Sequence, residues 1–264
     1  MDYARYQRKK TIRKIWVVAG LGFAAYWAAV SCKVDFSALR RGLPKGIEFL
    51  GFMFPPDLAA LAELVNPALE TVLLAFLATV FGAILSFFFA LAAASNVSPP
   101  WLRNASRFLL ATERSLPEII LLLLLISALG LGPFPGVIAM SIGCIGMLGR
   151  LFGDAIEEIN PATLESIQSV GANRWQVIRY GVVPQVLPSL IINTIFRFEV
   201  NIRLSVLLGA VGAGGIGYEL FYAFRLLEYQ RATSAILVIL ALVFLSEKLS
   251  GLLRKKVAPE IKLR

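Results

Sequence analysis

The amino-acid sequence predicts an all-α integral membrane protein, built as a bundle of six membrane-spanning helices. Of its 264 residues, 58% are hydrophobic and only 16% are charged. Together with a mean hydropathy of +0.74, this composition is typical of membrane proteins. A helix needs roughly 20 apolar residues to cross a hydrocarbon core of about 30 Å. The chain is therefore expected to consist mainly of membrane spans and their connections.

Six apolar runs are predicted to cross the membrane. The mixed segment 33–66 follows the first run, and its prolines and charges argue against a buried span. We expect an external connection there, with short interfacial helices. The glycine- and proline-rich turn GLGPFPG separates the third run from the fourth. The predicted spans are 15–31, 67–94, 108–129, 137–148, 186–211 and 232–253.

The basic residues predict the orientation of the chain. The net charge is +9, and its basic clusters at 5–14 and 254–256 flank the first and last apolar runs. The positive-inside rule explains this placement better than a nucleic-acid partner does. We predict a multi-pass protein of the bacterial inner (cytoplasmic) membrane, in contact with lipid and with both termini cytoplasmic. The run 15–31 lacks a convincing cleavage site, so we expect a retained anchor.

The residue inventory argues against an enzyme. The sequence has no histidine, and its two cysteines, Cys32 and Cys144, predict neither a disulfide nor a metal site. It also lacks a paired-carboxylate pocket and a P-loop. We therefore expect neither catalytic residues nor a cofactor bound by this chain.

The interval 150–185 is unusually polar for this chain and predicts two short helices joined by a glycine. Asn160 precedes a proline, the arrangement of a helix N-cap followed by proline at the first helical position. Gly171 suits a left-handed helix end. Asn173, with Gln176 three residues later, can form a capping box for the second helix.

Each helix of this pair carries an apolar stripe, which leaves three functions open. The stripe suits docking into the groove of a partner, or packing of an interfacial pair under its own bundle. A helix-turn-helix that reads DNA is less favoured, because the pair lies between two spans and lacks supporting helices. The residues of the stripes are Leu164, Ile167, Gly171, Trp175, Ile178 and Val182.

The spacing within this interval resembles the EAA motif of ABC importer permeases. In that family Glu-Ala-Ala, three residues, Gly, nine residues and Ile-x-Leu-Pro form the cytoplasmic coupling helix that docks on the ATPase subunit. This sequence keeps Glu165, Gly171 and Pro184 in register. The resemblance implies the fold of a type I ABC importer permease, with a coupling helix that receives the ATP-driven stroke.

The sequence departs from that motif at four positions. Ser166 and Ile167 replace the two alanines, Gly181 replaces the isoleucine, and Val183 replaces the leucine. The residues that the resemblance assigns to ATPase coupling are Glu165, Ser166, Ile167, Gly171, Ala172 and Pro184.

Further runs are similar to the permease subunit of phosphonate-type ABC importers; they read SVGANRWQVIRYGVVPQVLP, FRFEVNIR, VGAGGIG, GLGPFPGV and FPPD. The resemblance implies a homodimer that imports phosphonates or related phosphorus oxyanions such as phosphite and hypophosphite. It also implies two ATP-binding cassette ATPase subunits, which bind ATP with Mg, and an external (periplasmic) substrate-binding protein. The alternatives are an ABC permease for a different small solute and a secondary anion carrier.

The run VGAGGIG contains a GxGxxG pattern, but its context argues against a dinucleotide site. A Rossmann strand is followed by a helix and an acidic residue about 20 positions on, whereas this loop ends a membrane span. Two hypotheses remain: the glycines permit close packing or a bend, or they form a gate that presents backbone N–H groups to an anion. The candidate gate loop comprises Gly212, Gly214, Gly215 and Gly217.

Four charged or polar residues interrupt the fifth predicted span, where a lone charge costs several kcal/mol. Glu199 and Arg203 are four residues apart and can pair on one helix face. Arg197 has no such partner in its own helix, so Glu199 of a second subunit or a cytoplasmic neighbour could serve. The cluster is either a structural ion-pair network or a weak counter-charge for a dianionic cargo. The candidate translocation-path residues are Arg197, Glu199, Asn201 and Arg203.

Two other polar groups leave their roles open. Pro117 is expected to kink the third span, and the polar residues around it line either the pore or a helix seam. A cluster of three acidic residues precedes the coupling interval and is either solvated or paired with arginines of the ATPase. These groups are Thr112, Glu113, Arg114, Ser115 and Glu118, and Asp154, Glu157 and Glu158.

The chain is thus predicted to have three parts. Residues 1–66 comprise the basic tail, the first span and the external connection. Residues 67–253 form the permease core, with its coupling loop at 150–185. Residues 254–264 form a cytoplasmic tail.

Overall fold

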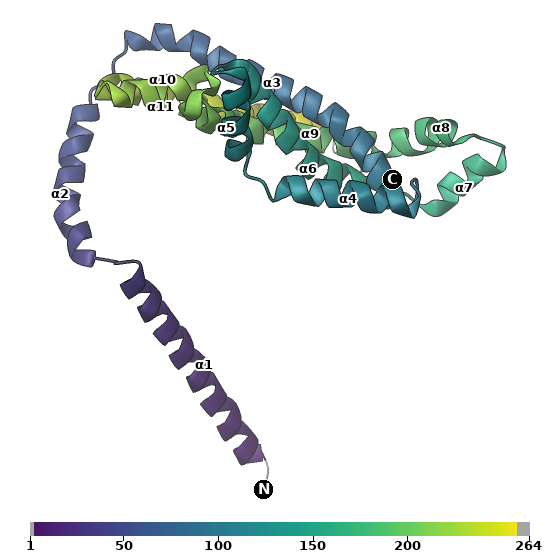
Figure 1. The fold of residues 1–264 in the computed structure, drawn as a ribbon, viewed down its shortest axis with the longest axis horizontal. Helices are drawn as coiled ribbons and strands as arrows, with labels where there is room; N and C mark the ends of the chain where they lie inside the picture. The colour runs from purple at the N-terminus through teal and green to yellow at the C-terminus, as the bar shows by residue number, and fades with distance from the viewer. Residues whose placement is uncertain (1–2, 258–264) are drawn as a thin grey trace. The chain divides into compact units, whose positions relative to one another are not determined.

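The computed structural model describes the backbone of residues 3–257. Side chains are described for residue 14 and for residues 16–257. The elements of this part are helices (Figure 1). Contacts divide the chain into two compact units, the first ending at Phe52 and the second beginning at Met53. We describe each unit by itself.

The first unit holds two helices, α1 (Tyr3–Ser31) and α2 (Phe36–Met53). Their described parts meet at an angle of 56° and could form one broken span or a re-entrant pair. The Asp35 carboxylate accepts a hydrogen bond of 2.7 Å from the Ser37 N–H and so helps to start α2. Instead of several short helices, the segment 33–66 contains one 18-residue helix and the first turns of the next helix, which begins at Ala60.

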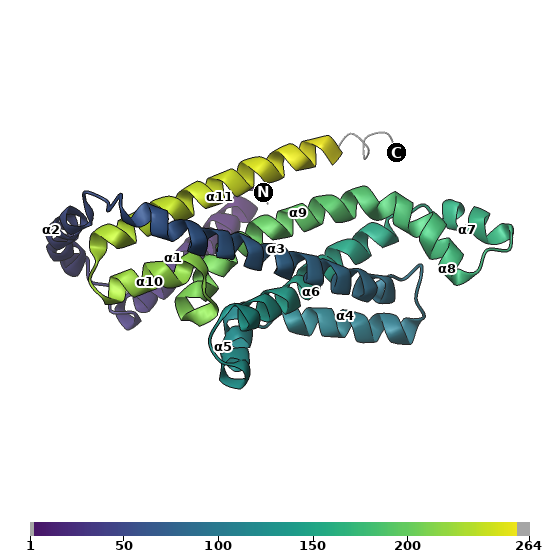
Figure 2. The ribbon, with the colours of Figure 1, turned by 90° about the horizontal axis from the view of Figure 1, so that it is seen from above.

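The second unit is a helical bundle, seen from two sides in Figures 1 and 2. Within the described residues it contains α3 (Ala60–Ala93), α4 (Pro100–Arg114), α5 (Glu118–Leu129), α6 (Pro133–Glu157), α7 (Pro161–Ser169), α8 (Arg174–Gln176), the π-helix η1 (Val177–Val182), α9 (Val183–Leu208), the π-helix η2 (Gly209–Ala213), α10 (Gly215–Arg225) and α11 (Tyr229–Val257).

Three helices of the described chain, α3, α6 and α11, are long and apolar enough to cross a membrane. The count rises to five if each of two bent pairs forms one span; these are α1 with α2, and the stretch Arg174–Ala213 with α10. Five of the six predicted spans overlap these helices. The remaining one, 108–129, is divided.

The division of the third predicted span falls at Pro117. Because proline has no N–H and disfavours a helical conformation in the residue before it, α4 ends at Arg114 and α5 begins at Glu118. The predicted kink is therefore a complete break. It leaves α5 as an apolar helix of only 12 residues.

The core of the bundle forms where α3 and α6 approach each other closely. Two small residues of α3, Ala75 and Ala78, are fully buried there, and such residues let helices approach closely. Gly82 lies directly against Cys144 of α6, so that an added Cβ would overlap the cysteine Cβ and lie 2.8 Å from its sulfur. The Ser86 hydroxyl joins both helices by donating to the carbonyl oxygens of Gly82 (2.6 Å) and Cys144 (3.2 Å).

Replacing Gly82 by alanine should destabilise the bundle, because the new methyl group has no space between α3 and α6. We expect Gly82→Ala to lower the free energy of unfolding by about 1–3 kcal/mol, the usual cost of overpacking. Gly153→Ala is the matched control, since its Cβ would meet only the Ala90 carbonyl oxygen, at 3.9 Å. Denaturation of the purified chain in detergent would measure both, and equal stability of the two variants would contradict this packing.

Candidate functional site

The pair of helices between α6 and α9 begins and ends as the sequence predicts. The Asn160 side chain accepts a hydrogen bond of 3.0 Å from the Ala162 N–H and caps α7. Gly171 has φ of +85°, the left-handed conformation expected after a helix end. Asn173 and Gln176 form the predicted capping box, with reciprocal hydrogen bonds of 2.8 and 3.0 Å.

The two helices pack on each other where the sequence departs from the EAA motif. Gly181 lies beneath α7, so that an added Cβ would be 2.9 Å from Ile167 Cδ1 and 3.2 Å from Leu164 Cδ2. Ile167, which replaces an alanine of the motif, thus occupies space beside Gly181. That space is free because Gly181 replaces the larger isoleucine of the motif. The two departures compensate each other in volume, and this was not predicted from the sequence.

One face of this unit packs on the bundle and the opposite face is open. Leu164, Val177 and Val182 are buried in a cluster that includes Phe152 of α6. Two large apolar side chains stay uncovered instead: Val170 is 83% exposed and Trp175 is 76% exposed. Figure 2 shows α7 and α8 extending beyond the neighbouring ends of α3 and α6. The unit therefore both packs under its own bundle and offers a free surface.

The motif residues are divided between these faces. Glu165, Ser166 and Gly171 are exposed, whereas Ile167 and Ala172 are half-buried and pack against the buried cluster. Pro184 lies in the first turn of α9. Of the six residues assigned to coupling, the exposed ones are those that a docked partner can reach directly.

Arg197 of α9 finds its partners on neighbouring helices of the same chain. The residue is only 3% exposed. Its Nε donates to the Cys144 sulfur at 3.2 Å, and its Nη2 pairs with Glu118 Oε1 at 3.4 Å. Nη1 lies 3.4 Å from the Met147 sulfur. The counter-charge is therefore Glu118 of α5, rather than Glu199 of a second copy.

Asn201 completes a buried polar cluster around Cys144. Its Nδ2 donates to Thr79 Oγ1 at 2.9 Å and to the Cys144 sulfur at 3.3 Å. With Arg197 and Glu118, these residues form what we call the Cys144 cluster, and it joins α3, α5, α6 and α9. Glu118 is one of the polar residues expected to line the pore or a helix seam, whereas no sequence pattern indicated the roles of Thr79 and Cys144. The four-residue spacing of Arg197 and Asn201 places both on one helix face.

Glu199 forms a second charged group on a different face of α9. It accepts from Arg203 at 2.9 Å, which confirms the predicted pair, and from Arg254 of α11 at 2.8 Å. Arg254 belongs to the basic last turn of α11. Glu199 therefore lies beside the basic end of that helix.

The four candidate path residues are not brought together. Arg197 and Asn201 contact α6 and belong to the Cys144 cluster. Glu199 and Arg203 form the group that reaches Arg254 on α11. Ion pairing within one chain thus accounts for the charges of Arg197, Glu199 and Arg203.

The glycine loop that follows α9 is a packed bend. Gly212, Gly214 and Gly215 have φ values of +111°, +81° and +70°, which only glycine adopts readily. The Gly212 carbonyl oxygen accepts a hydrogen bond of 2.9 Å from the Gly132 N–H in the turn before α6. Gly217 lies so close to the Val206 backbone that an added Cβ would overlap it.

Two backbone donors of this loop are already occupied. The Gly215 N–H donates to Glu70 Oε2 at 3.1 Å, and the Ile216 N–H donates to Thr71 Oγ1 at 2.9 Å. Two side chains of α3 therefore take the place that an anion would have at the start of α10. This geometry favours the packing hypothesis over presentation of these N–H groups to a cargo.

A bundle of membrane-length helices with an exposed helical unit between two of them defines a membrane subunit that docks on a partner outside the bilayer. The chain belongs to the family described as binding-protein-dependent transport system inner membrane component, which matches residues 82–259. It is thus a multi-pass inner-membrane protein and a permease subunit of an ABC importer, and not an enzyme.

Relatives with assigned names match most of the chain. The phosphite transport system permease protein PtxC of Stutzerimonas stutzeri is 35% identical over 247 residues, which cover 93% of this chain and 89% of that protein. The phosphate-import permease protein PhnE of Mycolicibacterium smegmatis is 41% identical over 242 residues, 91% of this chain but 45% of that protein.

A solved structure confirms the fold. The MetNI methionine ABC transporter, in an inward-facing conformation, contains a chain that matches 74% of this one with a TM-score of 0.64 and 22% sequence identity. The match covers 95% of that chain. The all-α type I permease fold predicted from the sequence is confirmed, and so is the prediction of a non-catalytic subunit that works with an ATPase and a binding protein.

The compensation between Ile167 and Gly181 can be tested with a double-mutant cycle. Gly181→Ile should clash with Ile167 and lower the free energy of unfolding by about 1–3 kcal/mol. Adding Ile167→Ala, which restores the alanine of the motif, should recover most of that loss. Chemical denaturation of the two single variants and the double variant measures the coupling; strictly additive effects would show that the two positions are independent.

Proposed function

We propose that this chain is the permease subunit of an ATP-driven importer for phosphonates or related phosphorus oxyanions such as phosphite and hypophosphite. Two copies would form the translocation path. The observation that carries the proposal is the similarity to a phosphite transport permease over 93% of this chain and 89% of that protein. The methionine transporter shares only the fold, so it does not favour methionine as the cargo.

The proposed partners follow from the open face of the α7–α8 unit. Two ATP-binding cassette ATPase subunits, which bind ATP with Mg, would dock on Glu165, Ser166 and Gly171, and an external binding protein would deliver the cargo to the other end. Trp175 and Val170 add apolar area to this surface. Apolar anchors ringed by polar groups are the usual composition of a docking site.

Both termini and the docking surface would lie on the cytoplasmic side. The 2.8 Å contact between Glu199 and Arg254 supports this orientation, because it places the basic end of α11 along α9. From Glu199, α9 runs back toward its first turn at Pro184 and the α7–α8 unit that precedes it. The docking surface therefore extends past the boundary that the basic residues mark.

The cargo class can be tested through ATP hydrolysis by the assembled complex. We would place this chain, its ATPase and its binding protein in nanodiscs and measure hydrolysis with the binding protein empty or loaded. We expect stimulation by phosphite or methylphosphonate and none by methionine. Stimulation of hydrolysis by another solute alone would refute the proposed cargo class. An equal rate of hydrolysis with and without this chain would refute its coupling to the ATPase.

Glu165→Arg and Gly171→Asp should uncouple hydrolysis from transport. Both residues lie on the open face, and no atom lies within 4 Å of a Cβ added at Gly171. Aspartate is one of the few residues that adopt the left-handed conformation of this position at modest cost. The chain should therefore still assemble in the membrane, while uptake per ATP hydrolysed falls by about ten-fold or more, as expected when a charged contact in an interface is reversed. Glu48→Arg, an exposed charge reversal on α2 and outside the motif, is the control. Normal coupling in both motif variants would contradict the assignment.

A further inference from the structure

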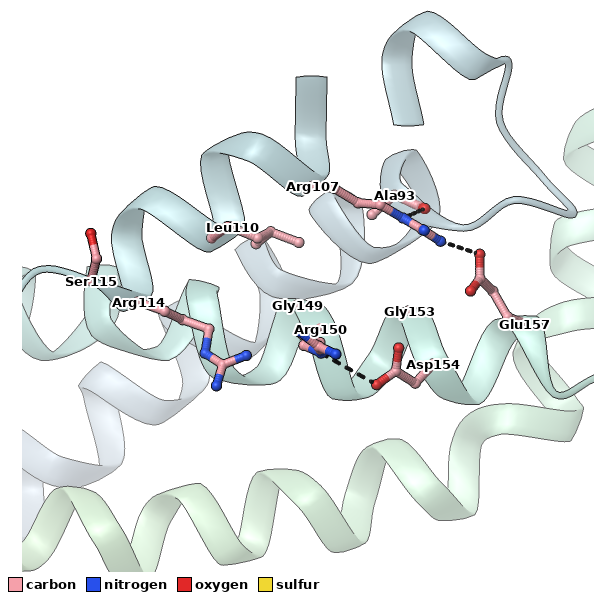
Figure 3. Close-up of a pocket in the computed structure, with 11 residues that line it drawn as sticks. Ala93, Arg107, Leu110, Arg114, Ser115, Gly149, Arg150, Gly153, Asp154 and Glu157 are labelled. Atoms are coloured by element: carbon pink, nitrogen blue, oxygen red, sulfur yellow. Dashed lines mark hydrogen bonds and ion pairs between the residues drawn. The ribbon is translucent and has the colours of Figure 1, made fainter. Parts of the chain in front are cut away.

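An open cavity of about 550 Å³ lies between α4 and α6, at the end of α6 that leads to the α7–α8 unit. Small residues of α6 let the two helices approach each other beside it. A Cβ added at Gly149 would lie 2.7 Å from Leu110 Cδ2, and one added at Gly146 would lie 2.7 Å from Arg114 Cγ. The stem of Arg114 is therefore held against α6, and its guanidinium reaches the cavity (Figure 3).

Three arginines line this cavity, and their charges are compensated unequally. Arg107 is fully engaged, because it pairs with Glu157 at 2.6 Å and donates to the Ala93 carbonyl oxygen at 3.0 Å. Arg150 pairs loosely with Asp154: their closest atoms are 3.7 Å apart. Arg114 makes no hydrogen bond or ion pair with any residue that the structure describes, although its charge interacts with the Glu113 carboxylate, which packs against Gly146 beside it.

The two available guanidiniums belong to side chains that line the same cavity. Figure 3 shows Arg114 and the pair of Arg150 with Asp154 in a row along α6, while Arg107 and Glu157 lie at the other end beside Ala93. Guanidinium groups bind phosphoryl oxygens through paired, charge-assisted hydrogen bonds. A small oxyanion in this row would meet one unpaired arginine and one weakly paired arginine.

We propose that this cavity binds the phosphorus oxyanion as it leaves the translocation path, with Arg114 and Arg150 as its direct contacts. This inference rests on the proposed function and adds a binding site at the cytoplasmic end of the translocation path. Asp154 competes with the anion for Arg150 and so promotes release. The side chains of Arg150 and Asp154 are 66% and 58% exposed, which keeps the site weak, as a transport path requires.

The composition of the lining favours a small cargo anion over a phospholipid headgroup. Leu110 is the one large apolar side chain among the described lining residues; alanine, glycine and polar residues make up the rest. An acyl chain would therefore find only one large apolar side chain to pack against beside the arginines. Two carboxylates, Asp154 and Glu157, also offset much of the positive charge that would attract an anionic membrane surface.

The test measures binding of phosphite to the complex of this chain with its ATPase, purified in a detergent without phosphorus. Broadening of the phosphite ³¹P resonance reports weak binding and needs no ATP hydrolysis. We expect Arg114→Gln and Arg150→Gln each to weaken binding by about ten-fold, as loss of a hydrogen bond to a charged group predicts. Asp154→Asn should tighten binding, because Arg150 loses its competitor.

Arg103→Gln is the matched control, since it removes the same charge from α4 outside the cavity. Equal losses in Arg103→Gln and Arg114→Gln would overturn the site and indicate general surface attraction. Phosphatidylglycerol that remains bound and blocks the phosphite signal would overturn it in favour of a lipid site. Because the assay requires no transport, unchanged binding in Arg114→Gln with normal uptake refutes this inference alone, whereas absent uptake by the unmodified complex refutes the proposed function.

Discussion

The hydrogen bonds that meet at the Cys144 sulfur fix α9 within the bundle, and the positions of both candidate functional regions depend on them. Arg197 and Asn201 both donate to this atom, which sits at the closest approach of α3 and α6. A buried guanidinium and a buried amide cost several kcal/mol unless they are paired. The hydrogen bonds of Arg197 and Asn201 to the Cys144 sulfur therefore favour this placement of α9 against α6.

This placement makes α9 the covalent link between the two regions. The helix has 26 residues, which corresponds to about 39 Å at 1.5 Å per residue. The α7–α8 unit precedes it through η1, and the glycine loop follows it through η2. Glu70 and Thr71 hold the start of α10 closed, so any opening at that end must break their hydrogen bonds to the loop.

Local features of the structure could be predicted from the sequence, and contacts between distant segments could not. The Asn160 cap, the left-handed Gly171 and the pair of Glu199 with Arg203 depend on residues at most four apart, so their spacing determines them. The partner of Arg197 is 79 residues away. Only the packing of α5 and α9 on α6 brings the two side chains together, and only the packing of α11 on α9 shows the contact between Glu199 and Arg254. The break at Pro117 was predicted as a kink, because sequence alone does not show how far α5 turns away.

The central claim is that ATP hydrolysed by another chain drives a phosphorus oxyanion through this one. The most direct measurement is uptake of labelled phosphite into proteoliposomes that contain this chain, its ATPase and its binding protein, with ion gradients dissipated. The account predicts accumulation that requires ATP on the ATPase side and stops with a non-hydrolysable analogue. Uptake that follows an ion gradient without ATP would contradict it and identify a secondary carrier.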